Sequence, residues 1–291
     1  MANLKEIRIR ISSVESTKQI TSAMKLVAAS KLRKAQDAII MMRPYAAKMH
    51  EIMQDLAAGS EVVAENAFAQ EREIEKVLMI GITSNRGLCG AFNANVIKQI
   101  NKRIESQYKS LNRRGGVDIM TIGKKATDFF DKPEYHLVEN HDHLWDNLNW
   151  ENVQDLAESI MEKFKEKEYD RVELVYNQFK NAGSQILQLE QFLPIEPMEE
   201  ENTSGHKHDY IMEPSQEVIV SELIPKSLKV QLYKAMLDSN AAEHGARMTA
   251  MHKATDNATD MIKDLKLTYN KARQASITNE IIEIVSGANA L

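Results

Sequence analysis

A glycine-rich segment is the first place in this sequence where chemistry is suggested. The segment Thr83–Asn93 reads TSNRGLCGAFN and follows an apolar stretch typical of a buried strand. Glycine-rich turns between a strand and a helix bind phosphate groups in many enzymes. However, Gly87 and Gly90 do not fit GxGxxG, and the chain has no GxxxxGK[ST] motif. The segment is therefore interpreted as a tight strand-to-helix turn.

The only cysteine of the chain, Cys89, lies inside this turn and is a candidate nucleophile. A thiolate nucleophile needs a supporting base, and no histidine lies near Cys89 in the sequence. A structural thiol is the simpler interpretation. A single cysteine also excludes an internal disulfide and a CxxC metal site, which indicates a reducing compartment.

Three further groups of residues are of types that bind metal ions. They are His141 with His143, His206 with His208, and the series Asp256, Asp260 and Asp264. An HxH pair on a strand can bind zinc, but both pairs lie in polar, loop-like stretches and are interpreted as solvated. The aspartates are interpreted as a solvated helix face, offset by nearby lysines. We therefore expect no cofactor and no metal.

Composition and charge narrow the classes of function. The 291 residues are 43% hydrophobic and 27% charged, without a run of 18 uncharged apolar residues or an apolar N-terminal signal. Residues 1–43 hold nine Lys/Arg against three Asp/Glu, a net of +6; residues 226–291 have +2, and the middle has −13. A basic end can bind nucleic acid or an acidic protein surface, and the residues alone leave both open.

Helix-forming residues dominate both ends of the chain. Residues 1–43 contain neither glycine nor proline, and no proline follows Pro225. This predicts one helix over 3–56, with Pro44 as its point of disturbance, and a second over 226–286. At 1.5 Å per residue these helices are roughly 80 and 90 Å long, so each is expected to project beyond the rest of the protein.

Both helices carry an apolar stripe that predicts a two-stranded, antiparallel coiled coil. The C-terminal stripe has an unbroken 3-4 spacing: Met251, Ala254, Ala258, Met261, Leu265, Thr268, Ala272, Ala275, Asn279 and Ile282. The N-terminal stripe is Leu4, Ile7, Ile11, Val14, Ile20, Met24, Val27, Leu32, Ala35, Ile39 and Met42. Many of the C-terminal positions are small, which allows close packing with a modest hydrophobic gain per layer.

The central segment alternates strand and helix patterns. Strands are predicted at 75–83, 117–123, 170–179 and 184–193, and helices at 91–109, 124–131 and 150–167. Continuous apolar strands alternating with helices predict an α/β domain with a mostly parallel sheet. Residues 196–209 are polar and without periodicity, and are expected to form a loop or disordered insert.

Three motifs resemble those of one known family. Residues 7–36 (IRIRISSVESTKQITSAMKLVAASKLRKAQ) resemble the N-terminal signature of F-type ATP synthase γ subunits of the bacterial type. Residues 243–287, with EHGARMTAMHKATDNA and LKLTYNKARQASITNEIIEIVSG, resemble the C-terminal signature, and TSNRGLCGAFN resembles the central motif. The resemblance runs along the whole chain and is weakest over 124–220.

The resemblance implies a fold and a set of partners. The terminal helices, in segments 1–58 and 215–291, would form a long antiparallel coiled coil, and 72–214 would form a Rossmann-like α/β domain. The coil would stand inside a ring of three α and three β subunits. The central domain would bind the ε subunit and the c-subunit ring. No nucleic-acid partner is implied, and membrane association would be only through the complex.

The resemblance also implies a mechanical role. Ion-driven rotation of the c ring would turn the chain, and its asymmetric shaft would drive the β subunits through their binding states to release ATP. Catalysis would belong to α and β, so the chain would not be an enzyme by itself. Its location would be peripheral, on the cytoplasmic face of a bacterial cell membrane.

Individual contact residues are carried over by motif. The resemblance assigns contacts with β to Met24, Lys25, Arg273, Gln274, Thr278 and Glu280, and contacts with the c ring to Tyr210 and Glu213. Two alternatives compete with this reading: a nucleotide-binding enzyme, and a coiled-coil scaffold or nucleic-acid binder. An equilibrium-binding titration with nucleotide tests the enzyme. Co-purification of α and β with the chain distinguishes a γ subunit from a scaffold or nucleic-acid binder.

Overall fold

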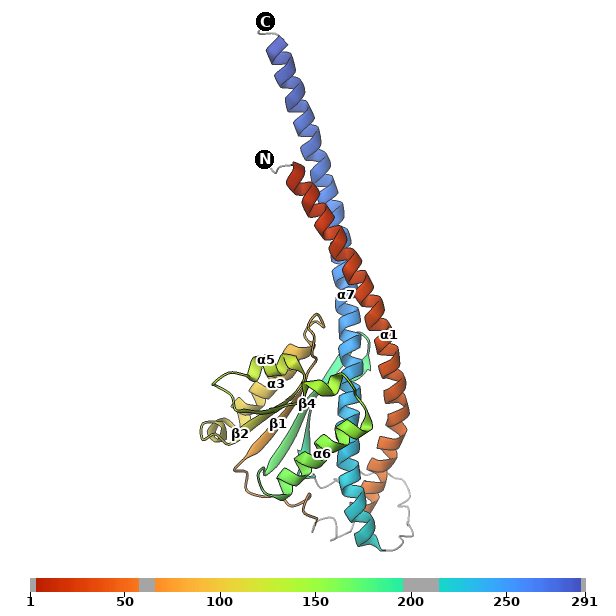
Figure 1. The fold of residues 1–291 in the computed structure, drawn as a ribbon, viewed down its shortest axis with the longest axis vertical. Coiled ribbons are helices and arrows are strands. Elements are labelled where there is room, and N and C mark those ends of the chain that lie inside the picture. Colours follow the sequence, from red (N-terminus) through yellow and green to blue (C-terminus); the bar gives the residue numbers. More distant parts are fainter. Residues whose placement is uncertain (1–3, 58–65, 196–214, 289–291) are drawn as a thin grey trace. The chain divides into compact units, whose positions relative to one another are not determined.

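The structure is a computed structural model that describes residues 4–57, 66–195 and 215–288. It divides into two compact units, unit 1 (Met1–Ala29 with Arg247–Leu291) and unit 2 (Ser30–Ala246). Two helices contribute to both units: α1 (Leu4–Ala57) and α7 (Gln216–Ala288). Figure 1 draws α1 in red to orange and α7 in teal to blue.

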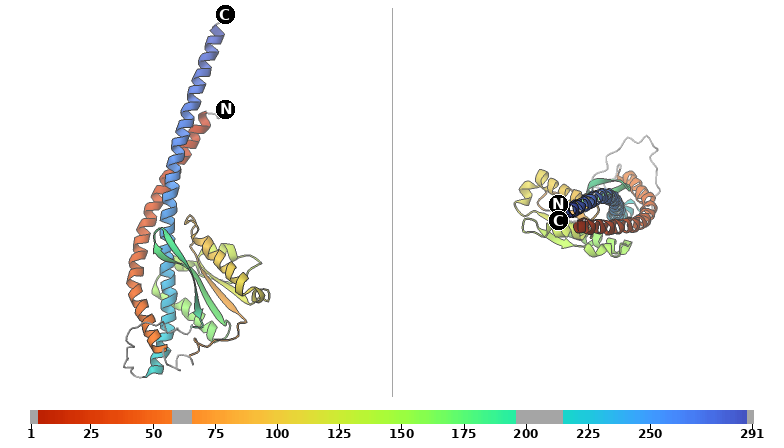
Figure 2. Two further views of the ribbon diagram at one scale, coloured as in Figure 1. Left: turned by 180° about the vertical axis from the view of Figure 1, so that it is seen from behind. Right: turned by 90° about the horizontal axis from the view of Figure 1, so that it is seen from above.

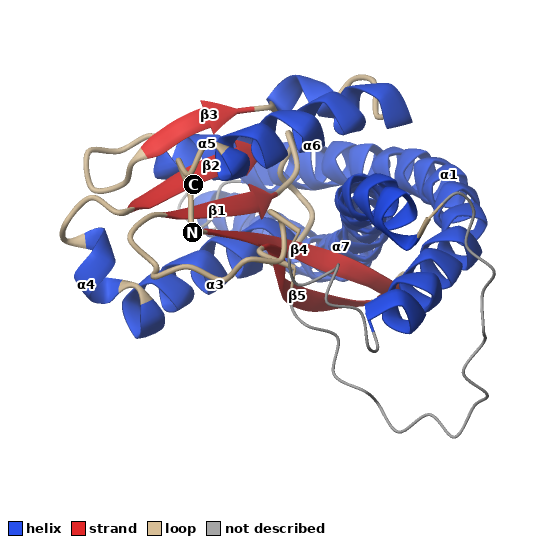
Figure 3. Ribbon diagram, turned by 90° about the horizontal axis from the view of Figure 1, so that it is seen from below, coloured by secondary structure: helices blue, strands red, loops and turns tan. Residues whose placement is uncertain are grey.

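Unit 2 contains a mixed sheet, seen from below in Figure 3. Its strands are β1 (Val77–Ile82), β2 (Val117–Ile122), β3 (Leu137–Asn140), β4 (Arg171–Asn181) and β5 (Ser184–Leu193). In the described residues the strand order is β3-β2-β1-β4-β5; only the β4–β5 pairing is antiparallel. This confirms the predicted mostly parallel sheet.

Helices cover both faces of this sheet (Figure 1). They are α3 (Phe92–Gln107), α4 (Lys109–Asn112), α5 (Lys124–Phe130), the 3₁₀ helix η1 (Asp142–Trp145) and α6 (Trp150–Lys165). Helices α3 and α5 pack on one face, and α6 and the first part of α7 pack on the other. The result is a three-layer α/β/α arrangement.

Strand β1 shows why the predicted apolar run becomes the centre of the sheet. Val77 and Met79 point into the cluster formed with α3, whereas Leu78 and Ile80 point into the cluster formed with α6 and α7. All four side chains are fully buried. A strand covered on both faces needs apolar residues at every position, which is the pattern that the sequence shows.

Two short elements of unit 2 have no counterpart in the prediction. Strand β3 has only four residues, and its side chains are half-buried or exposed at the edge of the sheet. The 3₁₀ helix η1 includes His143, which the sequence placed in a loop. Neither element has enough residues to produce a recognisable apolar period.

The predicted start of the C-terminal helix at 226 is wrong. Helix α7 begins at Gln216 and continues through Pro225, as α1 continues through Pro44. Burial of Val220 and Ile224 against the sheet contributes roughly 1.5–3 kcal/mol each. This is comparable with the cost of about 3 kcal/mol for a proline inside a helix.

Unit 1 is an antiparallel pair formed by residues 4–29 of α1 and residues 247–288 of α7 (Figure 2). Three polar contacts join the segments: Arg8 donates to the Tyr269 hydroxyl (2.7 Å), Lys266 pairs with Glu15 (3.1 Å), and the Thr21 and Thr255 hydroxyls lie 2.8 Å apart. Residue numbers rise along one helix as they fall along the other. The pairing confirms the predicted antiparallel coil.

The seam of unit 1 is more polar than predicted. The half-buried and buried positions that follow one continuous spacing are Ile7, Ile11, Val14, Lys18, Thr21, Lys25 and Ala28 on α1, and Met251, Thr255, Ala258, Ile262, Leu265, Tyr269, Ala272 and Ser276 on α7. These positions alternate between spacings of four and three residues, as in a heptad repeat. Also half-buried beside them are Leu4, Glu15, Met24, Ala29, Ala254 and Thr259.

The predicted stripes have the right period but are partly wrong. On α1 only Ile20 and Val27 of the stripe are exposed, whereas the exposed members on α7 are Met261, Thr268, Ala275, Asn279 and Ile282. Met261 is 46% exposed, whereas Ile262 is 9% exposed. On α1, Ile20 and Val27 are exposed, and Thr21 and Ala28 are buried in their place. The prediction favoured Ile20 over Thr21, but a hydroxyl can occupy the seam when it has a hydrogen-bond partner.

Within the described ranges, no helix is long and apolar enough to cross a bilayer. In the same ranges, no three His, Cys, Asp or Glu side chains gather closely enough to hold a metal ion.

Candidate functional site

Six of the eight predicted contact residues lie in unit 1. Met24 and Lys25 are half-buried on α1, next to or within the seam. The other four, Arg273, Gln274, Thr278 and Glu280, are exposed on α7. Tyr210, Glu213 and the insert at 196–209 lie outside the described residues, so their predicted roles stay predictions.

The two groups of contact residues occupy different levels of the helix pair. Arg8 faces Tyr269, so Arg273 lies about one turn further along, near the level of Leu4. Met24 lies twenty residues from Leu4 on the same helix, which is about 30 Å along the axis. The predicted contact residues thus fall into two groups at separate levels of unit 1.

The last turns of α7 form the first of these surfaces, beyond the described start of α1 (Figures 1 and 2). Large apolar side chains are exposed there: Ile277, Ile281, Ile282, Ile284 and Val285. Side chains of Gln274 and Glu280 accompany them on the same surface. Exposed apolar residues at this density indicate a surface that a partner covers.

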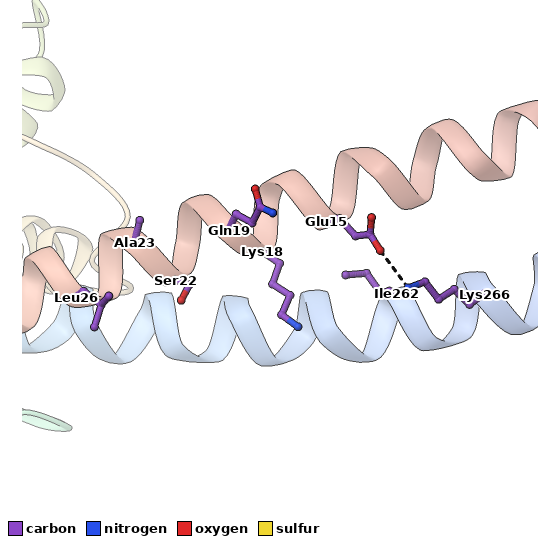
Figure 4. Close-up of a pocket in the computed structure, with 8 residues that line it drawn as sticks. All are labelled: Glu15, Lys18, Gln19, Ser22, Ala23, Leu26, Ile262 and Lys266. Atoms are coloured by element: carbon purple, nitrogen blue, oxygen red, sulfur yellow. Dashed lines mark ion pairs between the residues drawn. The ribbon is translucent and has the colours of Figure 1, made fainter.

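A shallow groove along α1 and α7 forms the second surface (Figure 4). Its lining residues are Glu15, Lys18, Gln19, Ser22, Ala23, Leu26, Ile262 and Lys266. The Glu15–Lys266 ion pair closes one side, and Leu26 on the other side is 68% exposed. The α1 residues of the groove flank Met24 and Lys25 in the sequence. The lining combines two lysines, Lys18 and Lys266, with apolar side chains.

The sequence analysis missed this groove. Lys18 occupies a seam position, but a stripe defined by apolar residues does not include a lysine. The usable signal was the strict 4-3 spacing that runs through Val14, Lys18 and Thr21. That spacing predicts a half-buried lysine whose stem packs in the seam while its ammonium reaches the surface.

Electrostatics at the tip of α1 reinforce the helix pair. The Arg8 guanidinium lies 5.7 Å from the centre of the Tyr269 ring as well as donating to its hydroxyl. The hydrogen bond to Tyr269 raises the pKa of Arg8 above its ordinary value. Arg8 is therefore a permanent cation at this level of unit 1.

The glycine-rich turn of unit 2 is held by its own side chains. The Ser84 amide donates to the Asn93 side chain (2.9 Å), and Asn93 donates to the Cys89 sulfur (3.2 Å). The Thr83 hydroxyl donates to the Gly123 carbonyl and accepts from the Ala126 amide. These bonds hold the segment between β1 and α3 as a tight strand-to-helix turn with Cys89 buried in it, as predicted.

The remaining candidates are arranged as follows. His141 contacts Glu139 (3.0 Å), and the His141 and His143 rings lie 5.8 Å apart. Asp256 and Asp260 are exposed, and Asp260 pairs with Lys263 (3.0 Å), as expected of a solvated face. His206 and His208 lie outside the described residues.

Comparison with known proteins identifies the family. The family model described as "ATP synthase" matches residues 3–291. Relatives called "ATP synthase gamma chain" are 59% identical in Flavobacterium johnsoniae and 57% identical in Christiangramia forsetii. Both alignments cover 100% of this chain and 99% of the relative. The chain belongs to the ATP synthase gamma chain family.

Solved structures with the same fold come from this family's assemblies. A chain of the Euglena gracilis mitochondrial ATP synthase rotor aligns with a TM-score of 0.66 and 23% identity, over 94% of this chain and 98% of that one. A chain of the Tetrahymena thermophila central stalk and c ring gives a TM-score of 0.60 and 24% identity, over 81% and 99%. Family membership assigns this chain to the central shaft of an F-type ATP synthase.

Proposed function

We propose that unit 1 is the part of the shaft that presses on the catalytic β subunits, and that the sheet of unit 2 faces the ε subunit and the c ring. Rotation of the c ring would turn unit 2, and unit 1 would drive each β subunit through its binding states. The proposal rests on the family match along the whole chain. The segments 1–58, 72–214 and 215–291 would serve as shaft helix, foot and shaft helix.

The exposed end of α7 supports a surrounding partner. Ile281, Ile282 and Ile284 are each more than half exposed, on a helix that lacks a described α1 partner at this level. Burying one such side chain against a partner is worth roughly 1.5–3 kcal/mol. A ring of α and β subunits would cover these residues and still permit turning, because apolar contact is not directional.

The charges of the groove support contact with an acidic segment of β. Lys18 lines the groove, and Lys25 lies two turns further along the same seam. Each exposed ion pair would contribute less than about 1 kcal/mol and would be screened by salt. Such contacts would steer the β lever to the shaft at certain angles without holding it there.

We also propose that the chain has no catalytic site and that α and β perform the chemistry. The turn at Thr83–Asn93 supports this, because its side chains are occupied in holding the fold. Ser84, Cys89 and Asn93 bond to one another, and Thr83 and Asn85 bond to backbone groups of neighbouring segments. Through its partners, the chain would be held peripherally at the cytoplasmic face of a bacterial cell membrane. Tyr210 and Glu213 are proposed to contact the c ring.

Co-purification tests the proposal. The tagged chain is expressed with the α, β and ε subunits of the same organism, and we expect all of them in one complex that hydrolyses ATP. The tagged chain alone is expected to show no ATP hydrolysis above buffer. Failure to capture α and β, or turnover by the chain alone, would overturn the proposal. A variant shortened after residue 273 should capture less α and β, because it lacks the apolar end of α7.

A further inference from the structure

A buried carboxylate lies where three elements of unit 2 meet. The Asp238 side chain, on α7, has no exposed surface. Its Oδ1 accepts a hydrogen bond from the Phe179 amide of β4 (3.4 Å) and lies 3.5 Å from the guanidinium of Arg43 on α1. Arg43 also donates to the Phe179 carbonyl (3.1 Å). One residue pair therefore connects both long helices with the end of a central strand.

Stability alone does not explain this carboxylate. Its second oxygen, Oδ2, and the hydroxyl of Ser239 beside it are buried without a hydrogen-bond partner among the described residues. A buried charge that is incompletely paired costs more free energy than a neutral group of the same shape. An asparagine could accept the same hydrogen bond from Phe179 without a buried charge, so the charge needs another reason to be present.

The neighbouring titratable groups offset only part of the cost of burying the Asp238 charge. Burial raises the pKa of Asp238, and Arg43 and Lys234 oppose this without cancelling it. On the sheet side, the buried hydroxyl of Tyr176 on β4 donates to Glu190 on β5 (2.7 Å). Glu190 thus accepts the hydrogen bond of the Tyr176 hydroxyl, and Asp238 is left to Arg43 and Phe179.

Helix α7 is also fitted closely against the end of this hairpin. Gly245 lies seven residues after Asp238, which places both on the same face of α7. A Cβ atom at Gly245 would lie 3.2 Å from the Cα and carbonyl oxygen of Ala182 and 3.4 Å from the Phe179 ring. Close backbone contact and a charged contact therefore occur together along one face of the helix.

We propose that Asp238 and Arg43 form a clasp that keeps α1, α7 and the end of β4 in register while torque passes through unit 2. The inference rests on the proposed function, because it assigns these residues to the part of the shaft that is driven. They are positioning residues, not catalytic ones. A short-range ionic contact with three elements resists sliding of the helices past the sheet, whereas apolar contacts allow it.

The unequal burial of the two partners makes the clasp testable. Arg43 is 49% exposed, so Asp238→Asn leaves a guanidinium that water can solvate. Arg43→Gln instead leaves a buried carboxylate without its cation, which is the more damaging change. We expect Asp238→Asn to melt at the same temperature as the parent chain or higher, and Arg43→Gln to melt lower.

The raised pKa of Asp238 also predicts how the stability of the chain changes with pH. Because the folded pKa of Asp238 is raised, the folded state binds the proton more tightly than the unfolded state. The stabilisation from this group is complete below the unfolded pKa and is lost as the pH rises through the folded pKa. Asp238→Asn should therefore remove this pH dependence of the melting temperature.

The deciding experiment uses the assembled complex in membrane vesicles. ATP hydrolysis and ATP-driven proton pumping are measured side by side for Asp238→Asn, Arg43→Gln and Arg43→Lys. A matched control is Asp128→Asn, which makes the same chemical change in the exposed Lys125–Asp128 pair (3.1 Å) of unit 2.

We expect Asp238→Asn to assemble and hydrolyse ATP but to pump fewer protons per ATP, with Arg43→Lys closer to the parent and Asp128→Asn unchanged. Normal pumping per ATP by a fully assembled Asp238→Asn complex would overturn the clasp. Equal loss in Asp128→Asn would also overturn it, because any surface charge would then suffice. Failure of the parent chain to assemble would contradict the proposed function instead, so the two failures are distinguishable.

Discussion

The two units of this chain bury different kinds of residue. In unit 2 the strands are apolar on both faces, and buried charges have partners on neighbouring elements, as Glu173 has in Arg103 and Tyr108. In unit 1 the seam includes Lys18, Thr21 and Lys25, while apolar residues face solvent. Those exposed residues include Ile9, Ile20, Leu26, Val27, Leu267 and Ile277.

This difference separates a self-sufficient fold from a partner-dependent one. Each ordered residue loses roughly 1–2 kcal/mol of backbone entropy, and a two-helix seam of small and polar side chains recovers little of it. The three-layer arrangement of unit 2 buries large side chains on both faces of a sheet and recovers much more. We therefore predict that unit 1 gains stability when a partner covers it, as a ring around a shaft would.

The largest expected contrast is in amide hydrogen exchange of the free chain. We expect amides of β1 and β4 to exchange only through global unfolding, at about 5–15 kcal/mol. Amides of residues 4–25 and 260–288 should exchange through local opening that costs far less. The measurement is exchange followed by mass spectrometry of peptides from both units.

The same measurement on the assembled complex is the control. Residues 4–25 and 260–288 should become protected there, while β1 and β4 change little. Strong protection of the helix ends in the free chain would contradict the idea that unit 1 depends on a partner.

The second prediction concerns a glycine of unit 2 whose surroundings leave no room for a side chain. Gly123 has a φ of +119°, and a Cβ atom there would lie 2.0 Å from the Thr83 carbonyl oxygen. Gly123→Ala should therefore lower the free energy of unfolding of unit 2 by about 3 kcal/mol or more. The measurement is urea unfolding followed by tryptophan fluorescence, since Trp145 and Trp150 are both in unit 2.

Gly87→Ala is the matched control for this change. Gly87 belongs to the same group of turns, but a Cβ atom there would meet nothing within 4 Å. It should change the free energy of unfolding by less than about 1 kcal/mol. Similar losses for the two variants would show that the contact with Thr83 is not what makes Gly123 necessary.

The third prediction concerns the exposed end of unit 1. Arg273→Ala with Gln274→Ala should slow ATP turnover of the assembled complex more than it reduces assembly. Losing one charge-assisted and one neutral hydrogen bond to β, about 2–3 kcal/mol, would slow the step that needs them roughly 30- to 150-fold. Steady-state ATP hydrolysis is measured beside the subunit ratio on a gel.

Lys271→Ala, on the same exposed stretch of α7, is the control for general loss of surface polarity. It should leave turnover close to that of the parent. Normal turnover in the double variant would mean that Arg273 and Gln274 form a passive surface. Equal slowing by Lys271→Ala would mean that the effect is not specific to them.

The sequence predicted the parts of the molecule that depend on local pattern. The strands at 117–123 and 184–193 and the helix at 150–167 agree with the structure within two residues, because each has a clear apolar pattern. The start of α7 was missed because proline argues locally against a helix. Its packing on the sheet, which overrides that preference, depends on residues far away in the chain.

The contact residues were predicted only by resemblance, and their geometry was not predictable. Lysine and threonine are both common on exposed helix surfaces, so only the 4-3 spacing through Val14, Lys18 and Thr21 indicates that they lie in a seam. Their burial depends on which face α7 presents at that level. The sequence analysis did not predict the contact between Asp238 and Arg43 either, because the two residues are almost two hundred positions apart in the chain.

The smallest expected effect concerns the polar seam itself. The Thr21 and Thr255 hydroxyls bond to each other, and each also donates or can donate within its own helix, to the Lys18 carbonyl (3.1 Å) and the Met251 carbonyl (2.8 Å). A hydroxyl that loses its cross-helix partner is therefore not left unsatisfied. Each single change to valine should cost less than about 1 kcal/mol of local opening free energy.

The double variant decides what the hydroxyl pair does. With Thr21→Val and Thr255→Val together, methyl groups meet across the seam, and removing both polar partners is nearly neutral or stabilising. We expect the double variant to exchange amides near residues 21 and 255 no faster than the parent, and slower than either single variant. The resulting coupling energy in the double-mutant cycle should be about 0.5–1 kcal/mol. If the double variant instead exchanges faster than both singles, the hydroxyl pair stabilises unit 1 in a way that apolar contact cannot replace. Unit 1 would then resemble unit 2 in depending on its internal polar contacts.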